Sequence, residues 1–330
     1  MKTINHWING KNVTSKEYFT TTNPANGEVL AEVASGGQLE IDQAVAAAKE
    51  AFPKWANTPM KERARLMRRL GDLIDQNVPE IAAMETADTG LPIHQTKNVL
   101  IPRASHNFEF FAEVCQQMNG KTYPVDDKML NYTLVQPVGV CALVSPWNVP
   151  FMTATWKVAP CLALGNTAVL KMSELSPLTA DRLGELALEA GIPPGVLNVV
   201  TGLGTETGSA LGLHHDIDVI AFTGSTAVGK AFMAYSAQSN LKQVWLECGG
   251  KSANIIFADC QDLDLAAEKA AFGICFNQGE VCSANSRLLV ERPIYAAFIA
   301  KLQEKMQAWA PAHPLEPQSR MGAMVSAAHA

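Results

Sequence analysis

Between residues 138 and 247, short apolar runs rich in β-branched residues alternate with stretches that have helical periodicity. The runs are VGVCALV (138–144), TAVLK (167–171), VLNVV (196–200), DVIAF (218–222) and QVWLE (243–247), and helices fit between them at 152–164, 177–190, 205–213 and 226–237. Strand–helix–strand units of this kind form right-handed crossovers and a parallel sheet. The pattern therefore predicts an α/β fold with a Rossmann-like domain, whose ligands bind at the carboxyl ends of the strands.

The segments on either side of this alternation have different patterns. Residues 1–35 predict short strands and turns, several helices follow, one of them at about 98–117, and 129–136 alternate like an exposed hairpin strand. A second alternation starts with a strand at 254–257 and continues with helices at 262–274 and 294–309. So few strands predict either a small second α/β domain or one of which these 330 residues hold only a part.

Charge and composition exclude several classes of protein. The net charge of -6 gives no electrostatic reason to expect nucleic acid or an anionic membrane as a partner. The most apolar stretch, 138–170, is interrupted by prolines and a lysine, so we expect no membrane span. The seven cysteines form no CxxC pair and no metal-ligand spacing with histidine, which favours free thiols, no metal site and a reducing cytoplasm.

Polar clusters follow the first two predicted strands. SPWNVP (145–150) suits a rigid loop that projects Trp147 and Asn148, although a plain Asx-type turn explains the same residues. In VLKMSE (169–174), Lys171 and Glu174 are placed to hydrogen-bond the hydroxyls of a ribose, and a surface ion pair is the alternative.

Two further clusters follow the later strands. FTGSTAVGK (222–230) places Gly224, Ser225 and Gly229 between a strand and a helix, where Ser225 is a natural N-cap and backbone N–H groups could bind phosphate; a plain turn is the alternative. In LECGGKSAN (246–254), Glu247 ends a strand and could serve as a general base, or could be an ordinary strand-end acid.

One cysteine lies in a setting that favours reactivity. Most lone cysteines are small buried hydrophobes, and Cys248 and Cys275 have apolar neighbours of that kind. Cys282 instead lies in FNQGEVCSANSR (276–287), a polar loop that offers N–H donors and access to its thiol.

Together, in this order, SPWNVP, VLKMSE, FTGSTAVG, LECGGKS and FNQGEVC resemble one family, the aldehyde dehydrogenases, and the resemblance spans the whole chain. It implies oxidation of an aldehyde to a carboxylate with NAD, and more weakly with NADP, through a thioester on a cysteine. It also implies the site. The catalytic residues would be Cys282 (nucleophile), Glu247 (base), Asn148 (oxyanion amide) and Lys157 (proton relay). The cofactor-binding residues would be Trp147, Lys171, Glu174, Gly224, Ser225 and Gly229, and the substrate tunnel would be lined by Val149, Thr153, Trp156, Phe276, Val281 and Ser283.

The resemblance further divides the chain into an NAD-binding domain (1–120 and 137–250), an oligomerisation hairpin (121–136) and the N-terminal part of a catalytic domain (251–330). Full-length relatives are homodimers or homotetramers, whereas a fragment would not necessarily assemble. The family's C-terminal segments, including a motif like EIFGP, do not occur in this sequence, and Cys248 stands where relatives have a larger aliphatic residue.

The substrate stays open, because the resemblance is split between two branches of the family. Residues 1 to about 200 resemble the semialdehyde dehydrogenases of homoprotocatechuate breakdown, and residues from about 202 to 330 resemble the γ-glutamyl-aminobutyraldehyde and guanidinobutyraldehyde dehydrogenases. Two other hypotheses remain. One is a catalytically silent fragment, and the other is a CoA-acylating aldehyde dehydrogenase, against which Glu247 argues because transfer to CoA needs no base to activate water.

Overall fold

A seven-stranded sheet forms the centre of the computed structural model, which describes residues 2–330. Its order is β12-β11-β8-β9-β10-β2-β3. The first five of these strands are parallel: β8 (Val140–Val144), β9 (Thr167–Lys171), β10 (Leu197–Val199), β11 (Val219–Gly224) and β12 (Gln243–Cys248). They confirm the predicted parallel sheet. The N-terminal strands β2 (His6–Ile8) and β3 (Lys11–Val13) extend it in antiparallel fashion, which the sequence pattern did not indicate.

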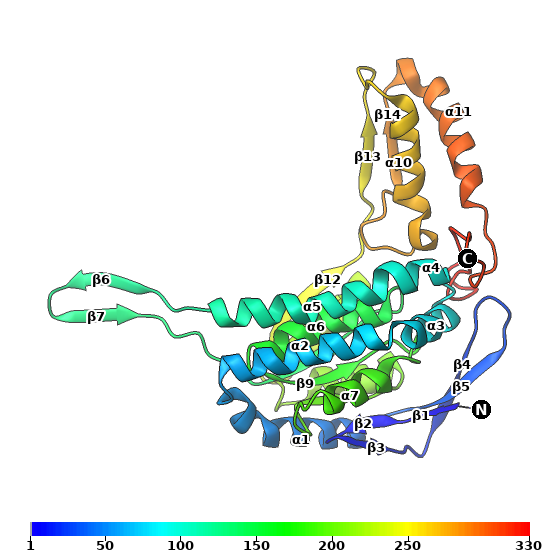
Figure 1. The fold of residues 1–330 in the computed structure, drawn as a ribbon. Helices are drawn as coiled ribbons and strands as arrows, with labels where there is room; N and C mark the ends of the chain where they lie inside the picture. The colour runs from blue at the N-terminus through cyan, green and yellow to red at the C-terminus, as the bar shows by residue number, and fades with distance from the viewer. Residues whose placement is uncertain (1) are drawn as a thin grey trace.

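Helices cover both faces of this sheet (Figure 1). Alternate residues of one strand point to opposite faces. Cys141 and Leu143 of β8 accordingly join a core with α2 (Met60–Gln76), α5 (Ile101–Val114), α6 (Pro150–Ala163) and α7 (Ala180–Glu189). Val140 and Ala142 join the opposite core with α1 (Gln38–Ala56), α8 (Ser209–Leu213) and α9 (Thr226–Gln238). The sheet is therefore buried on both sides, as continuous apolar runs predict.

Several predicted helices have different bounds in the structure. The helix expected at 98–117 is α5 flanked by a π turn (Thr96–Leu100) and a 3₁₀ turn (Cys115–Gln117), and the helix expected at 205–213 begins with a π turn (Gly204–Gly208). Beside them lie α3 (Val78–Thr89) and the short α4 (Ile93–Gln95). A separate three-stranded sheet contains β1 (Lys2–Ile4), β4 (Tyr18–Thr22) and β5 (Val29–Ala34).

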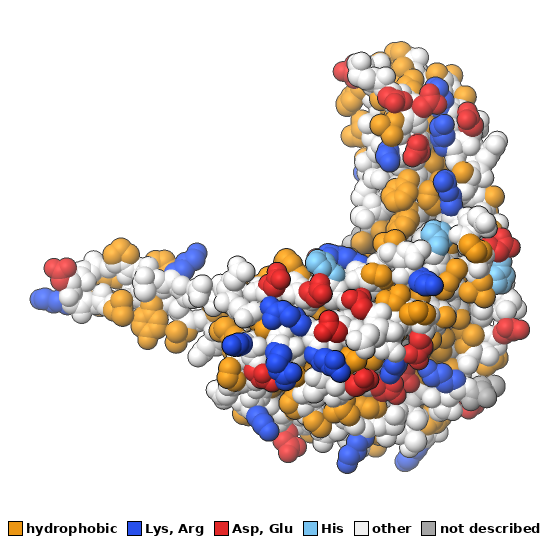
Figure 2. All heavy atoms as spheres, viewed as in Figure 1, with side chains coloured by type: hydrophobic (Ala, Val, Ile, Leu, Met, Phe, Trp, Pro, Cys, Tyr) orange, Lys and Arg blue, Asp and Glu red, His pale blue; other side chains and the backbone are white. Residues whose placement is uncertain are grey.

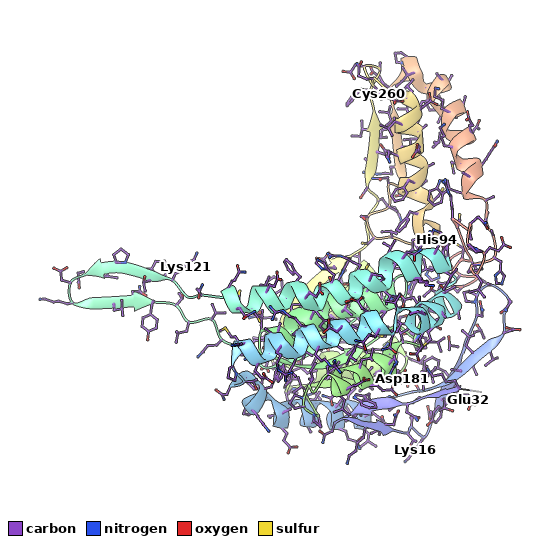
Figure 3. All side chains as sticks on the ribbon, viewed as in Figure 1. Lys16, Glu32, His94, Lys121, Asp181 and Cys260 are labelled. Carbon is purple, nitrogen blue, oxygen red and sulfur yellow. The ribbon has the colours of Figure 1, made fainter. Side chains whose placement is uncertain are left out.

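A second α/β unit rises from the body of the molecule near its C-terminal end (Figure 1). It contains the parallel pair β13 (Ala253–Ile256) and β14 (Arg287–Val290), with α10 (Leu263–Cys275) and α11 (Tyr295–Met306) beside them. Ile256, Ala267 and Phe298 form its small core, and Cys260 lies at its far end (Figure 3). The outer faces of its strands carry the exposed side chains of Ile255 and Leu289.

A long hairpin projects from the other side of the body, starting near Lys121 (Figures 1 and 3). Its strands β6 (Thr122–Asp126) and β7 (Met129–Tyr132) are exposed at every residue, and Figure 2 shows hydrophobic side chains along it. The paired part of β7 ends at Tyr132, short of the predicted residue 136. Within residues 2–330, no helix combines the length and apolar character needed to cross a membrane.

Candidate active site

A cavity of about 620 Å³ lies where the loops after β8 and β11 meet the segment that carries Cys282. Its walls bring together many residues singled out in the sequence: Trp147, Asn148, Val149, Thr153, Trp156, Gly224, Ser225, Phe276, Val281, Cys282 and Ser283. These residues come from three distant parts of the chain. All six expected tunnel positions lie on the wall, whereas Glu247, Lys157, Lys171, Glu174 and Gly229 do not.

The loop that bears the nucleophile candidate leaves α10 through residues Phe276–Gly279, where Asn277 and Gln278 have non-helical backbone angles. Cys282 is exposed, unlike the buried Cys275 at the end of α10. The loop approaches the segment after β8 closely, because the Nδ2 of Asn148 donates to the backbone carbonyl of Glu280 at 2.6 Å. The amide of Asn148, which is expected to stabilise an oxyanion, therefore contacts Glu280, two residues before Cys282. The thiol of Cys282 is the group expected to create that oxyanion.

The side chain of Lys157 is buried, at 9% exposed, and contacts Thr223, which lines the cavity. Its Nζ donates to the Oγ1 of Thr223 at 2.8 Å, near the end of β11. Burial lowers the pKa of Lys157 to about 8, and the charge of Glu247 partly offsets this effect. An amine with a pKa near neutrality can exchange a proton under physiological conditions, which agrees with the expected relay.

Glu247 lies at the end of β12, the edge strand of the large sheet, with its side chain exposed. Its backbone pairs with that of Thr223, the residue that holds Lys157. Glu247 thus lies at the end of a strand, as the sequence predicted. Its side chain does not line the cavity that contains Cys282.

The start of α9 has the geometry of an anion site. Ser225 is its N-cap and accepts a hydrogen bond from the N–H of Val228 at 3.3 Å, which confirms the predicted cap. The exposed N–H groups at such a helix start favour negative charge. Gly229 is buried one turn later, and a Cβ there would lie 3.1 Å from the Sγ of Cys248. The structure therefore gives Gly229 a role in packing α9 on β12.

Lys171 and Glu174 form an ion pair at the end of β9, with 3.2 Å between Nζ and Oε2. The other Glu174 oxygen, Oε1, accepts the N–H of Gly204 at 3.2 Å. Burial on its own would raise the pKa of Glu174, but Lys171 and the backbone N–H groups outweigh it and lower the pKa. An ionised carboxylate beside an ammonium group is the arrangement that holds a ribose diol in dinucleotide-binding folds.

Comparison with known proteins identifies the family to which the chain belongs. The family model described as "Aldehyde dehydrogenase family" matches residues 7–330. This chain belongs to the aldehyde dehydrogenase family. Members of the family are oxidoreductases that act on aldehydes with NAD(P).

Among relatives, the chain is 70% identical over 329 residues to the 5-carboxymethyl-2-hydroxymuconate semialdehyde dehydrogenase of Escherichia coli, covering all of this chain and 69% of that enzyme. It is 45% identical to the NADP/NAD-dependent aldehyde dehydrogenase PuuC of Escherichia coli (strain K12), covering 98% of this chain and 66% of PuuC. The crystal structure of an indole-3-acetaldehyde dehydrogenase complexed with NAD+ superposes with a TM-score of 0.97 at 43% identity, covering 98% of this chain and 66% of that one. The chain thus spans about two thirds of the length of these relatives.

Two buried groups near the aldehyde dehydrogenase site were not singled out in the sequence, although Asn277 lies within the FNQGEVC motif. Glu85 of α3 is fully buried, and its Oε2 accepts the N–H of Phe151 in the first turn of α6, 3.2 Å away. Burial raises the pKa of Glu85 to about 8. Asn277, also fully buried, donates from Nδ2 to the backbone carbonyl of Asn148 at 3.2 Å. Both contacts join residues far apart in the sequence, so no local pattern could have revealed them.

Glu280, two residues before Cys282, lines the same cavity. Burial raises its pKa to about 7, and the N–H of Val325, which donates to Glu280 Oε1 at 3.1 Å, partly offsets this shift. At the other end of the cavity, the rings of Trp147 and His329 pack edge to face with their centroids 4.5 Å apart.

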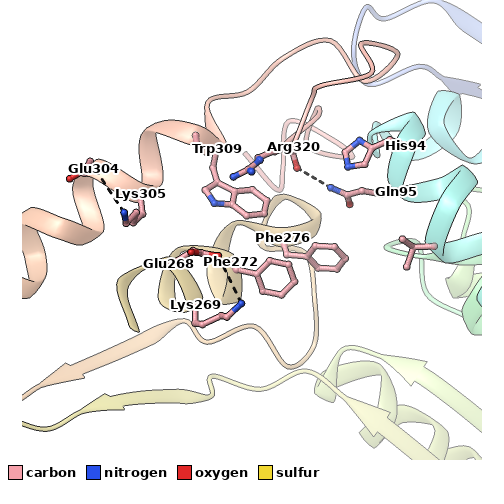
Figure 4. A pocket seen from close by; sticks show the side chains of 12 residues that line it. His94, Gln95, Glu268, Lys269, Phe272, Phe276, Glu304, Lys305, Trp309 and Arg320 are labelled. Atoms are coloured by element: carbon pink, nitrogen blue, oxygen red, sulfur yellow. Dashed lines mark hydrogen bonds and ion pairs between the residues drawn. The ribbon is translucent and has the colours of Figure 1, made fainter. Parts of the chain in front are cut away.

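A second cavity, of about 600 Å³, lies beyond Phe276, which lines both spaces (Figure 4). Phe272 stacks on Phe276 with a centroid distance of 5.1 Å, and Arg320 lies over the ring of Trp309 at 5.7 Å. Charged side chains of α10 and α11 surround these rings. Phe276 therefore lies between the space next to Cys282 and the second space, which α4 and the second α/β unit enclose.

Proposed function

We propose that this chain oxidises an aldehyde to a carboxylate with NAD through a thioester on Cys282. The observation that carries the proposal is the shared cavity in which Cys282 and Asn148 approach each other across more than a hundred residues of sequence. A thiol, an amide donor and a helix start suited to phosphate then border one space. This is the set of groups that covalent aldehyde oxidation requires.

In the first step the Cys282 thiolate adds to the carbonyl carbon, the C=O double bond opens, and its electron pair moves to oxygen. The second N–H of Asn148 and the backbone N–H of Cys282 are the donors that we assign to this oxyanion. Preorganised donors act where charge develops, and removing one costs about 10²–10³ in rate. NAD, when bound, accepts the hydride that leaves the tetrahedral carbon as the oxyanion collapses to the thioester.

The second half of the reaction releases the acid. Glu247 takes a proton from water, the resulting hydroxide attacks the thioester carbon, and the Cys282 thiolate leaves. Because Glu247 does not line the cavity in this structure, its carboxylate must turn toward Cys282 for this step. Lys157, held by Thr223 and close enough to Glu247 for their charges to interact, is the group that we assign to carry the released proton away.

The residues present fit a dinucleotide. Ser225 and the N-terminus of α9 suit its pyrophosphate, with Trp147 beside them, and Lys171 with Glu174 suits the adenosine ribose. A 2′-phosphate would meet the ionised carboxylate of Glu174, so we propose a preference for NAD over NADP. PuuC, named for both cofactors, supports some tolerance of NADP.

The same proposal covers the architecture around the site. We assign 1–120 and 137–250 to NAD binding, 251–330 to catalysis and 121–136 to assembly with a second copy of the chain, because the β6–β7 hairpin exposes apolar side chains along its whole length. The seven cysteines are all unpaired, which suits a reducing compartment such as the cytoplasm.

The cavity wall near Cys282 is mostly apolar, with Val149, Trp156, Phe276 and Val281 on it. This supports an aldehyde with an uncharged stem next to the carbonyl group. A fitting panel of substrates contains simple aliphatic aldehydes, aromatic aldehydes and semialdehydes, since a close relative is named for a semialdehyde.

Product analysis tests the proposed reaction. The chain is incubated with NAD and each aldehyde, with and without CoA, while NADH and the acyl product are measured. We expect NADH and free acid in equal amounts without CoA. NADH formation that requires CoA would instead support an acylating enzyme, and NAD binding without any NADH would support a silent protein.

A further inference from the structure

The nucleophile loop contains three consecutive residues in the left-handed region. The φ angles are 52° at Asn277, 55° at Gln278 and 76° at Gly279. Glycine adopts this conformation freely and asparagine tolerates it, whereas glutamine rarely does. Strained backbone of this kind persists only where surrounding contacts hold it, and it clusters at functional sites. The contacts that hold this loop therefore identify residues that matter for the site.

Asn277 makes the contacts that join the loop to the segment after β8. Its Nδ2 donates to the backbone carbonyl of Asn148 at 3.2 Å and to that of Glu280 at 3.3 Å. The carbonyl of Glu280 also accepts the Nδ2 of Asn148, and the N–H of Glu280 donates to the carbonyl of Asn277 at 2.8 Å. The two asparagines and Glu280 thus form a closed set of hydrogen bonds between the two loops.

This arrangement orients the amide of Asn148. One of its N–H groups is directed at the Glu280 carbonyl, and its Oδ1 accepts the N–H of Val149 at 3.1 Å. The amide plane is therefore fixed, and a single N–H remains for a ligand. Asn277 fixes the backbone on both sides of this contact, because its Nδ2 donates to the carbonyls of Asn148 and Glu280 at once.

The Oδ1 of Asn277 is buried without a hydrogen-bond partner. An unsatisfied buried acceptor destabilises a fold, and a glycine would keep the left-handed backbone without this penalty. The amide of Asn277 thus carries an unsatisfied oxygen, and what it contributes to the site is the pair of hydrogen bonds that its Nδ2 donates.

We propose that Asn277 is a positioning residue, which locks the Cys282 loop onto the Asn148 loop so that the free N–H of Asn148 faces the carbonyl oxygen of the aldehyde that the thiolate attacks. This inference rests on the proposed function and assigns the alignment of its oxyanion donor to a residue that touches neither substrate nor cofactor.

A double-mutant cycle tests whether Asn277 acts through Asn148. Asn148→Ala, Asn277→Gly and the double variant are compared with the unaltered chain in the pre-steady-state burst of NADH. We expect each single variant to lose about 10²–10³ in burst rate, the range for one lost oxyanion donor, and the double variant to lose no more than Asn148→Ala. Multiplied losses in the double variant would show that the residues act independently and would overturn the inference.

Asn9 offers a matched control. Its φ is 51°, and it lies far from the cavity at the turn between β2 and β3. Asn9→Gly makes the same replacement at the same backbone conformation and should leave the burst unchanged. Should Asn277→Gly fail to fold, Asn277→Asp keeps the shape and the left-handed tolerance but cannot donate to the two carbonyls, and it should show the same loss and the same non-additivity.

Hydrogen exchange separates this inference from the proposed function. Asn277→Gly should speed exchange of the amide hydrogens of both Val149 and Glu280, whereas Asn9→Gly should change neither. If the unaltered chain gives no burst, the proposed function fails, and exchange alone decides the inference. Unchanged exchange in the Val149 segment would show that Asn277 does not hold the two loops together.

Discussion

The strand ends of the large sheet and the loop that carries Cys282 supply the two parts of the candidate site, but they are built in different ways. At the ends of β9 and β11 the cofactor-binding candidates have partners: Glu174 has both Lys171 and Gly204, and Ser225 caps its own helix. In the nucleophile loop the backbone is strained, the Oδ1 of Asn277 has no partner, and the pKa of Glu280 is raised to about 7. Relaxed structure thus supplies the geometry for binding, whereas reactivity depends on structure held out of its relaxed state.

The largest expected effect comes from the nucleophile. Cys282→Ala removes the sulfur that would bond to the substrate, so hydride transfer should fall to the uncatalysed background. NAD affinity, measured by fluorescence titration, should stay within about twofold, because the strand-end groups are untouched. A normal NADH burst in Cys282→Ala would show that the loop does not supply the nucleophile, and the functional difference between this loop and the strand ends would then be lost.

A smaller loss is expected for the base. Glu247→Gln keeps the shape of the side chain but cannot take a proton from water, so steady turnover should fall by about 10²–10⁴. The first burst of NADH should survive, because hydride transfer precedes the need for water. Glu280→Gln is the matched control, since Glu280 is the only carboxylate of residues 2–330 on the cavity wall. Stopped-flow recording of NADH formation compares the two variants. A greater loss of steady turnover in Glu280→Gln than in Glu247→Gln would show that Glu280 is the base.

The next effect concerns the stability of the scaffold. Glu85 is fully buried with a pKa raised from 4.5 to about 8, so the native state binds its proton more tightly than the unfolded state. Stability should therefore fall as the pH rises from about 4.5 to about 8, where the full penalty is present. Glu85→Gln keeps an acceptor for the N–H of Phe151 and should be more stable than the unaltered chain at about pH 8.5, by on the order of a few kcal/mol.

Urea denaturation at about pH 5 and about pH 8.5 checks this prediction. The midpoints of the two proteins should lie closer together at the lower pH, because pH 5 is only about half a unit above the unfolded-state pKa of 4.5 and most of the penalty has not yet developed. A residual slope should remain in the variant, since burial also raises the pKa of Asp88, to about 7. Identical pH profiles would mean that Glu85 carries no burial penalty.

The smallest expected effect is cofactor choice. Replacing the ionised Glu174 with glutamine removes the repulsion toward a 2′-phosphate, so the ratio of kcat/KM for NADP to that for NAD should rise about tenfold. The Lys171 ammonium stays in place and should keep NAD binding measurable. An unaltered chain that already uses NADP as well as NAD would contradict the role given to Glu174.

The strand ends could be predicted from the sequence because parallel strands bring their carboxyl ends to one edge. Glu174 and Ser225 each follow directly from their place after an apolar run, and both occupy the predicted positions. The edge position of Glu247 could not be predicted, since the order of strands in a sheet is a tertiary property. Asn277 and Glu85 act through contacts with residues more than sixty positions away, and no periodicity or motif records such contacts.

The proposed mechanism requires a covalent bond between the substrate and Cys282. Trapping this bond is the most direct test of the mechanism. Glu247→Gln is mixed with NAD and an accepted aldehyde, quenched with acid after the burst, digested and examined by peptide mass spectrometry. The account predicts the acyl mass on the peptide that contains Cys282, in an amount equal to the NADH of the burst. An acyl group on another residue, or a full burst with no acyl group on the protein, would contradict it.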